Sequence, residues 1–553
     1  MKQLPKFYVI FSIIVVTSII ISFLLSAYIY YEQDEYYLFY LCNNLQFPFI
    51  SLTNEHFTPF RDWLFCSQYA LFGLSVFPRL IIAVFFHLFT LYLIYKILHK
   101  LKITHPVITP LLILLLATNV TISQAYLWLS TYSGTMPSII FSLLSLIKFM
   151  DYLELIKKSD LIKCLLYLFI ALLFKEYAIF LFPFYLFTPL LIKKFHPKFP
   201  ITKFKTFIIT ICVFGFIYLL ARSVIQLNSN YSSLITSNLT GNGFTSDVLS
   251  YISIGNKSLF QIILPYEFFF DISGLDQNNV INQFSSHIFK SILGAVLWIF
   301  ILVTLIIKKK KKYLNHILLL LLILYSLSLI PFTILSPSNS FLMLENRYYY
   351  LFGVIWIPII STLILIYRSK ITEIILSLFL LVVIFLNISY FYSMLIEKSD
   401  SSNARKKIVE IIVNDIRSND KDKYLIVYID GNIPGYYGLP TIKIPFQSGF
   451  GNILAVNLFD NKTYIDTSYF MHKDTIKFYE INSEGVSIFN KRKTFGYFLT
   501  YKSLYRYVQK NQQALVYIHC YYWDYRNNKL LVETTKCKDA LRKDILKKEP
   551  NGI

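Results

Sequence analysis

Long stretches without a charged side chain restrict most strongly how this chain can fold. A helix that crosses a bilayer needs roughly 20 apolar residues, whereas a soluble core needs no such runs. Residues 106–147 are even long enough for two crossings. Five long apolar stretches that contain no Asp, Glu, Lys or Arg are 7–31, 106–147, 317–344, 348–367 and 374–396. They predict an integral membrane protein of the all-helical, multi-pass class.

Shorter apolar runs bring the predicted number of spanning helices to about eleven. Tilt and snorkelling Lys or Arg side chains at their ends make up the missing length. These runs are 80–95, 164–174, 177–192, 206–221 and 291–307. The first run, 7–31, follows Lys2 and Lys6. We expect it to be a retained spanning helix, because it is longer than the apolar part of a signal peptide and no small-residue cleavage site precedes Glu32.

The net charge of +21 lies largely in every second loop. Positive loops of a multi-pass protein face the cytoplasm, so this charge predicts topology and gives no reason to expect a nucleic acid partner. The basic clusters are Lys96, Lys100 and Lys102; Lys157, Lys158 and Lys163; Lys193, Lys194, Lys198, Lys203 and Lys205; the lysine run 308–312; and Arg368 with Lys370. The N-terminus is then cytoplasmic, and the chain is expected in the plasma (inner) membrane.

This topology divides the chain into two predicted domains. Residues 1–396 form the transmembrane domain, with a first outer loop at 30–79 and a second long one at 222–290. The first outer loop is acidic, which fits the same orientation. Residues 397–553 return to mixed charge, and 424–430 read as a buried strand, with 514–520 also strand-like. We therefore expect a small α/β domain on the outer face.

Four of the six cysteines fall in the predicted outer segments. Cys42 and Cys66 share the first outer loop, and Cys520 and Cys537 share the C-terminal domain. In an oxidising compartment such pairs form disulfides. The alternative, four unpaired cysteines that are small buried residues, stays open.

Several charged residues fall at the outer ends of the predicted helices. A charged side chain at the centre of a spanning helix costs roughly 2.5–3.5 kcal/mol, so charges near a membrane boundary call for a reason. The candidates are Asp34, Glu35, His56, Lys175, Glu176, Arg222 and Arg347. Carboxylates and cations at one depth suit sugar transfer from a lipid-phosphate donor. One carboxylate removes the proton of the acceptor hydroxyl, and the cations stabilise the departing phosphate.

An ordered set of short motifs over about residues 7–370 resembles the GT-C glycosyltransferases, which use polyprenyl-phosphate sugars and include protein mannosyltransferases and bacterial enzymes of surface glycans. The motifs are Asp34-Glu35, Tyr69-Ala70-Leu71-Phe72-Gly73-Leu74, Phe86-His87-Leu88, Tyr95-Lys96-Ile97-Leu98, Trp128-Leu129-Ser130, Leu172-Leu173-Phe174-Lys175-Glu176 and Arg347-Tyr348-Tyr349-Tyr350. The resemblance implies a GT-C-like fold and an inverting transferase. Its partners would be a polyprenyl-phosphate sugar, the bilayer, and a glycan, lipid or protein acceptor.

The resemblance also assigns roles to residues. Asp34 is the expected general base, with Glu35 as the alternative, and Arg347 is expected to bind the donor phosphate. Lys175 would assist Arg347 or hold Glu176 in place. His56 stands near the position of a segment that resembles His-Pro-Pro-Leu in the family. In this chain the sequence there is His-Phe-Thr-Pro, an imperfect match.

Other interpretations remain open at this stage. Some relatives carry Arg and Asp at the turn where this chain has Ser133-Gly134-Thr135-Met136, so no cofactor is implied and a divalent metal is left open. Each candidate residue has a structural alternative, such as a helix-flanking charge, an ion pair at a turn or an interface anchor. A glycan polymerase or ligase of the O-antigen type, and a transporter or flippase, are the competing functions.

Overall fold

The structure is a computed structural model that describes part of the chain. The described residues are 38, 42, 58–195, 204–228, 251–252, 254–256, 258, 262–263, 280–307, 311–334, 348–419, 424–430, 485–489, 493–498, 501–510, 512–524 and 529–546. The chain divides into two compact units. The first comprises 1–26, 50–64 and 77–394, and the second comprises 27–49, 65–76 and 395–553.

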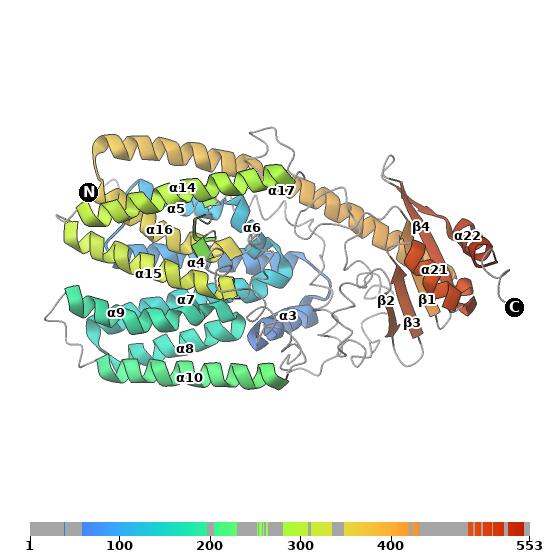
Figure 1. Ribbon diagram of the computed structural model, residues 1–553, viewed down its shortest axis with the longest axis horizontal. Coiled ribbons are helices and arrows are strands. Elements are labelled where there is room, and N and C mark those ends of the chain that lie inside the picture. The colour runs from blue at the N-terminus through green and yellow to red at the C-terminus, as the bar shows by residue number, and fades with distance from the viewer. Residues whose placement is uncertain are drawn as a thin grey trace. The chain divides into compact units, whose positions relative to one another are not determined.

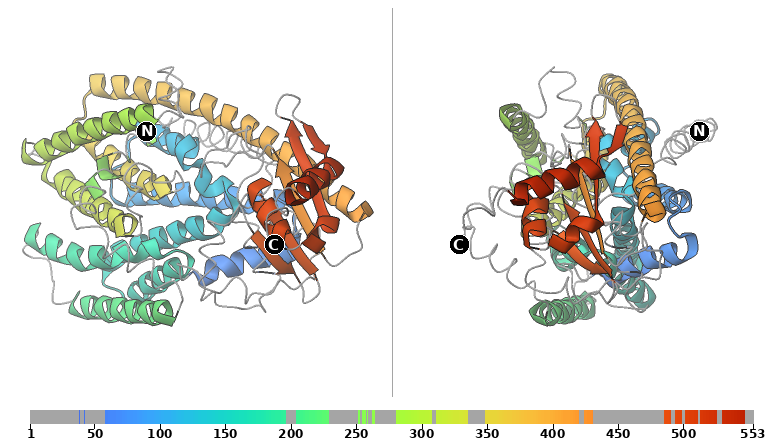
Figure 2. Two further views of the ribbon diagram at one scale, coloured as in Figure 1. Left: turned by 45° about the vertical axis from the view of Figure 1, so that its right-hand side comes forward. Right: turned by 90° about the vertical axis from the view of Figure 1, so that its right-hand side faces the viewer.

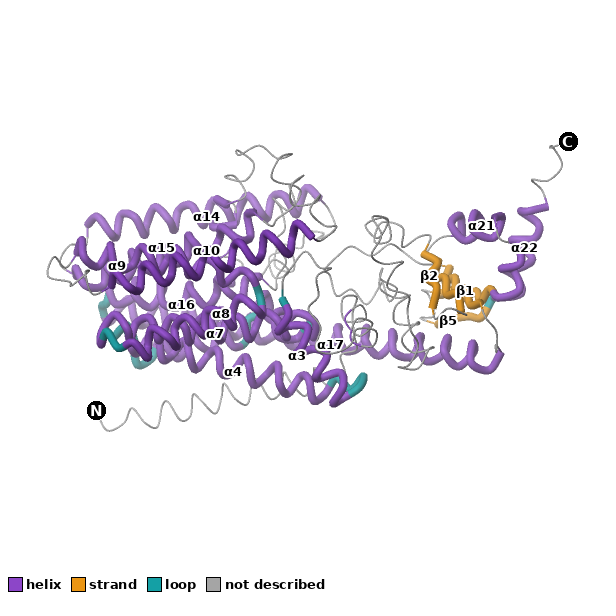
Figure 3. The backbone as a smooth tube through the Cα atoms, turned by 90° about the horizontal axis from the view of Figure 1, so that it is seen from below, coloured by secondary structure: helices purple, strands orange, loops and turns teal. Residues whose placement is uncertain are grey.

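The first unit is a bundle of helices that lie side by side (Figure 1). Its elements are α3 (Pro59–Phe72, which continues into the second unit), α4 (Phe77–Lys100), α5 (Ile108–Ala117), α6 (Val120–Leu127), α7 (Leu129–Leu155), α8 (Lys158–Phe174), the 3₁₀ helix η1 (Glu176–Phe180), α9 (Leu181–Phe195), α10 (Lys205–Asn228), α14 (Val280–Ile307), α15 (Lys312–Ile334), α16 (Tyr349–Ile366) and the first half of α17 (Lys370–Asn419). Figure 3 shows the same helices from below.

Among the described residues, eight helices are long and apolar enough to cross a membrane. A ninth crossing arises if α5 and α6, which meet at a bend of 52°, form one broken span. α8 is also apolar but has only 17 residues. The run 7–31 lies outside the described residues, so the number of eleven stays a prediction.

The helix ends that adjoin the basic clusters come together at one end of the bundle (Figure 1). α4, α7, α9 and α14 end there, and α8, α10, α15 and α17 begin there. We call this the basic-loop end. The other end holds the start of α7, the junction of α8 with η1, and the start of α16. We call it the opposite end.

Of the eight long apolar helices, α16 is the most enclosed, and its residues from Tyr349 to Ile366 are buried except for Ile360 and Leu365, which are partly exposed. Its Trp356 is 1% exposed, and the ring lies 4.9 Å from that of Tyr325. α10 and α14, by contrast, leave large apolar side chains such as Ile217 and Ile299 exposed. A helix that is apolar all round and buried all round forms a core, whereas exposed apolar faces suit contact with lipid.

Polar side chains join α16 to the break between α5 and α6. Nδ1 of His87 in α4 lies 2.6 Å from the hydroxyl of Tyr350, and its Nε2 lies 3.3 Å from the carbonyl oxygen of Ala117. The carbonyl can only accept, so Nε2 donates to it and Nδ1 accepts from the tyrosine. Beyond the break, the amide of Asn119 donates to Oδ1 of Asn387 at 3.2 Å.

The second unit contains a mixed five-stranded sheet in the order β2-β3-β1-β4-β5. The strands are β1 (Tyr424–Asp430), β2 (Gly485–Phe489), β3 (Lys493–Phe498), β4 (Ile518–Asp524) and β5 (Lys529–Val532). β1 pairs in parallel with β3 and β4, and the edge strands β2 and β5 pair antiparallel. In Figure 2, β1 is drawn in orange, and the other strands, α21 and α22 are drawn in red.

Helices cover the sheet of the second unit. Leu504 of α21 (Tyr501–Lys510) and Leu541 of α22 (Thr534–Leu546) share one core with Tyr428 and Ile518 of the strands. Successive side chains of a strand point to opposite faces, so Tyr521, three positions after Ile518 in β4, lies on the other face of the sheet. There its hydroxyl donates to Asp415 of α17 at 2.7 Å. The arrangement is that of an α/β domain, and its location on the outer face stays a prediction.

Some boundaries differ from those that the sequence predicts. The predicted strand at 424–430 coincides with β1, but the one at 514–520 begins only at Ile518, because Gln512–Tyr517 form a 3₁₀ helix, η6. α17 continues beyond 396 to Asn419. Its extension is polar overall but buries residues spaced three and four apart, the pattern of an amphipathic helix. These are Ile408, Val409, Ile412, Val413 and Ile416.

Two disulfides are present in the second unit. Cys42 is bonded to Cys66, with Cα atoms 5.2 Å apart, and Cys520 to Cys537, with Cα atoms 6.2 Å apart. Cys164 and Cys212 are free thiols. The second disulfide joins β4 to α22 and so closes the side of the core that α22 covers.

We expect Trp356→Ala to destabilise the bundle by about 3–5 kcal/mol, the usual cost of truncating a buried aromatic side chain. The control Ile217→Ala, at a site 56% exposed, should change stability by less than about 0.5 kcal/mol. Thermal unfolding of the purified protein in detergent measures both. Equal effects of the two substitutions would contradict the central position of α16.

Candidate functional site

The structure describes three of the residues that the sequence singles out for function: Lys175, Glu176 and Arg222. Asp34, Glu35, His56 and Arg347 lie outside the described residues, so their roles stay predictions. The described ones belong to the first unit and to its opposite end. Their surroundings show which parts of the chain meet there.

Lys175 and Glu176 occupy the short turn between α8 and η1. The backbone of Lys175 is extended, and its N–H donates to the carbonyl of Ala171, which ends α8. Ser138 of α7 fixes the turn from the side, since its hydroxyl lies 3.0 Å from the carbonyl oxygen of Ala171 and 3.3 Å from that of Lys175. Two charged residues are thus held on a rigid support.

Glu176 forms an ion pair with Arg222 of α10. Nε of Arg222 lies 2.8 Å from Oε1 of Glu176, and the side chains are only 14% and 12% exposed. The sequence predicts that Arg222 ends its helix. In the structure α10 continues to Asn228, so Arg222 lies inside the helix. The pair joins η1 to α10 across 46 positions of the chain, which the sequence alone does not reveal.

Lys175 lies beside Tyr348, the residue that precedes α16. Its Nζ is 5.8 Å from the centroid of the Tyr348 ring, within the range of a cation–π contact. Tyr348 packs edge-on against Phe332 at 5.3 Å, and Phe332 in turn stacks on Tyr177 at 5.7 Å. These contacts bring the turn after α8 to the residue that directly follows Arg347.

A second charged pair, in α3, is one that sequence analysis missed as a site. Nε and Nη2 of Arg61 lie 2.8 and 2.7 Å from Oδ1 of Asp62. Asp62 is 1% exposed, and its buried Oδ2 has no hydrogen-bond partner among the described residues. The sequence shows Asp62 only as one of several acids in the first outer loop. Its burial cannot be predicted there, because it depends on helices that lie far along the chain.

Gly134 of α7 makes room for this pair. A Cβ there would lie 3.0 Å from Cδ of Arg61 and 3.2 Å from the carbonyl oxygen of Phe174, which precedes Lys175. Phe60 also packs edge-on against Phe174, with ring centroids 5.6 Å apart. α3, α7 and the end of α8 therefore approach closely, and the two charged pairs belong to one region. We call Arg61, Asp62, Lys175, Glu176 and Arg222 the helix-end cluster.

The helix-end cluster combines two carboxylates with three cations, in a setting that is partly shielded from solvent. Low exposure strengthens electrostatic interactions, and a carboxylate oxygen without a partner can accept a hydrogen bond from a ligand. The arginines suit binding of an anion such as phosphate. No group of three or more His, Cys, Asp or Glu side chains placed to hold a metal ion occurs in the described part of the chain.

The chain has no detectable similarity to known proteins. No family model, curated protein or solved structure matches it. The resemblance to GT-C enzymes therefore stays an expectation that rests on the motifs in the sequence.

We expect Glu176 and Arg222 to be energetically coupled. Glu176→Gln and Arg222→Gln should each lower the thermal unfolding temperature, because each leaves a poorly solvated charge behind. The double variant should lose less than the sum, with a coupling energy of about 0.5–3 kcal/mol.

The matched control is the pair of Arg368 and Glu373, which joins the same atoms at the same 2.8 Å but exposes 57% of the arginine. The same four-variant cycle there should show weaker coupling, since solvent screens exposed pairs. A larger coupling in the exposed pair would contradict our interpretation of the Glu176–Arg222 contact.

Proposed function

We propose that this protein is a membrane glycosyltransferase of the GT-C type. It would move a sugar from a polyprenyl-phosphate donor to an acceptor hydroxyl, with inversion, in the synthesis of a cell-surface glycan or glycoprotein. The observation that carries the proposal is the helix-end cluster, in which carboxylates and cations meet at the end opposite the basic loops. If those loops are cytoplasmic, this end faces outward, in the plasma membrane.

The proposed roles follow from the chemistry of the reaction. Asp34 takes the proton of the acceptor hydroxyl, with Glu35 as the alternative. Arg347 binds the donor phosphate and stabilises its charge as the sugar leaves. The contact between Lys175 and Tyr348 supports a second cation beside Arg347. Asp62 is a further candidate for the base, because one of its buried oxygens has no partner among the described residues.

One observation favours the competing transporter function, namely the break between α5 and α6. Transporters use discontinuous helices, but typically in corresponding positions of two repeated halves. Here side chains of His87 and Asn119 form hydrogen bonds with backbone groups on the two sides of the break, so these backbone groups are not left for a substrate. A polymerase or ligase of diphosphate-linked glycans gains no particular support from the described residues.

Asp34→Asn should reduce sugar transfer by about 10²–10⁴-fold, because the amide cannot accept the hydroxyl proton. The donor and acceptor are first identified by comparing lipid-linked sugars and surface glycans of a deletion strain with those of its parent. Transfer is then measured with the purified variant. The control, Glu55→Gln, changes another acid of the same predicted loop and should keep normal activity.

The outcome at Asp62 separates the two candidate bases. If Asp34→Asn retains full activity while Asp62→Asn loses it, the base is Asp62. If both variants are fully active and the deletion strain keeps every glycan, the transferase proposal is wrong.

Arg347→Ala should raise the KM for the lipid-linked donor more than the KM for the acceptor. Losing a charge-assisted contact to phosphate costs about 1.5–3 kcal/mol, which corresponds to roughly 10–150-fold. Lys175→Met should have the same selectivity with a smaller effect. Equal changes in both KM values would argue against phosphate binding at this position.

A further inference from the structure

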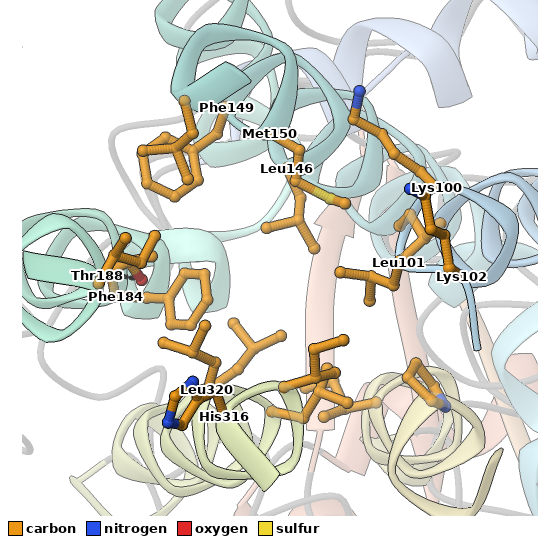
Figure 4. A pocket seen from close by; sticks show the side chains of 18 of the residues that line it. Lys100, Leu101, Lys102, Leu146, Phe149, Met150, Phe184, Thr188, His316 and Leu320 are labelled. Carbon is orange, nitrogen blue, oxygen red and sulfur yellow. Dashed lines mark hydrogen bonds between the residues drawn. The ribbon is translucent and has the colours of Figure 1, made fainter. Parts of the chain in front are cut away.

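An unfilled cavity lies inside the bundle on the side of the basic-loop end, away from the helix-end cluster. It is enclosed by α4, α7, α9, α15 and α16 and has a volume of about 430 Å³ (Figure 4). Protein interiors are normally packed without voids of this size. Such a volume falls instead within the range of ligand-binding pockets, roughly 300–1,000 Å³.

The deeper wall of this cavity is apolar. In Figure 4, Leu146, Phe184 and Leu320 point from three different helices towards the empty space. The hydroxyl of Thr188, also on the wall, donates to the carbonyl of Phe184 at 2.7 Å and is therefore already satisfied. A cavity lined in this way stays dry and accepts apolar ligands.

The polar residues of the lining lie where α4 and α7 end and where α15 begins, at the basic-loop end. They are Lys100, Lys102, Glu154, Tyr313 and His316. The cavity is thus polarised: apolar inside and polar at the rim. This is the shape that fits an amphiphile with its chain inward and its head group at the rim.

Charge at the rim selects the head group. Lys100 is committed to Asp151 at 2.5 Å and to Glu154 at 3.3 Å. Lys102 is exposed and follows directly after α4, where its backbone N–H donates to the carbonyl of His99 at 3.0 Å. An exposed lysine in the lining favours an anionic head group.

We propose that this cavity holds one acyl chain of an anionic phospholipid, with the phosphate of the lipid at Lys102. A neutral lipid would fill the apolar part equally well but would gain nothing from the cationic rim. A free phosphate ion would gain nothing from the apolar wall. The inference is independent of the proposed glycosyl transfer, because it concerns the other end of the bundle.

Native mass spectrometry of the detergent-purified full chain tests the proposal. Phosphatidylglycerol and phosphatidylcholine with identical acyl chains are the probes. We expect phosphatidylglycerol to bind several-fold more tightly, and Lys102→Gln to lower its affinity about fivefold, the effect of one basic residue near an anionic lipid. Binding of phosphatidylcholine should change less in this variant, because the ammonium group of this lipid offsets the charge of its phosphate.

Cavity filling supplies the second arm. Leu146→Trp should weaken binding of both lipids, whereas Ile217→Trp, on the exposed face of α10, should leave binding unchanged. Equal binding of the two lipids to the unmodified protein would overturn the proposal. So would an unchanged preference in Lys102→Gln, which changes an exposed residue and does not disturb the core, or an equal loss in both Trp variants.

Discussion

A peptide group in an apolar medium has no water to bond with, and this constraint underlies most of the first unit. Helices satisfy it internally, so the long apolar runs are all helical where the structure describes them. At the break between Ala117 and Val120, side chains provide what the helix cannot. His87 donates to the carbonyl of Ala117, and Oδ1 of Asn119 accepts from the backbone of Ile122. The bundle tolerates the break because these side chains form hydrogen bonds with the backbone groups that the interrupted helix leaves unpaired.

The same constraint positions the start of α16. A single imidazole ring, that of His87, bonds both the end of α5 and the hydroxyl of Tyr350 in the first turn of α16. Tyr350 stands three positions after Arg347, and Tyr348 between them meets Lys175. The placement of the first turn of α16 therefore depends in part on a buried histidine that itself has no role in the proposed chemistry.

Hydropathy predicts the helices well, because the preference of an apolar run for an apolar medium depends only on the composition of that run. The run 348–367, for example, corresponds to α16, Tyr349–Ile366. Contacts between runs were not predictable. The partner of Glu176 is Arg222, and no spacing in the sequence points to it. Asp62 was overlooked for the same reason, since Gly134 and Phe174 shape its surroundings. The continuation of α17 was missed because hydropathy falls after 396, although an amphipathic pattern persists.

The two ends of the bundle use charge differently. At the basic-loop end, Lys100, Asp151 and Lys148 are 21% to 28% exposed and link α4 to α7, which suits a structural network with little desolvation cost. At the opposite end, Asp62 is nearly inaccessible, and Glu176 and Arg222 are only slightly exposed. Burying charges costs more than exposed pairing returns, so stability alone gives a weak reason for them. A buried carboxylate with an unpaired oxygen is costly for folding but useful for proton transfer. We place the proposed chemistry at the opposite end because its charges are more costly than stability alone explains.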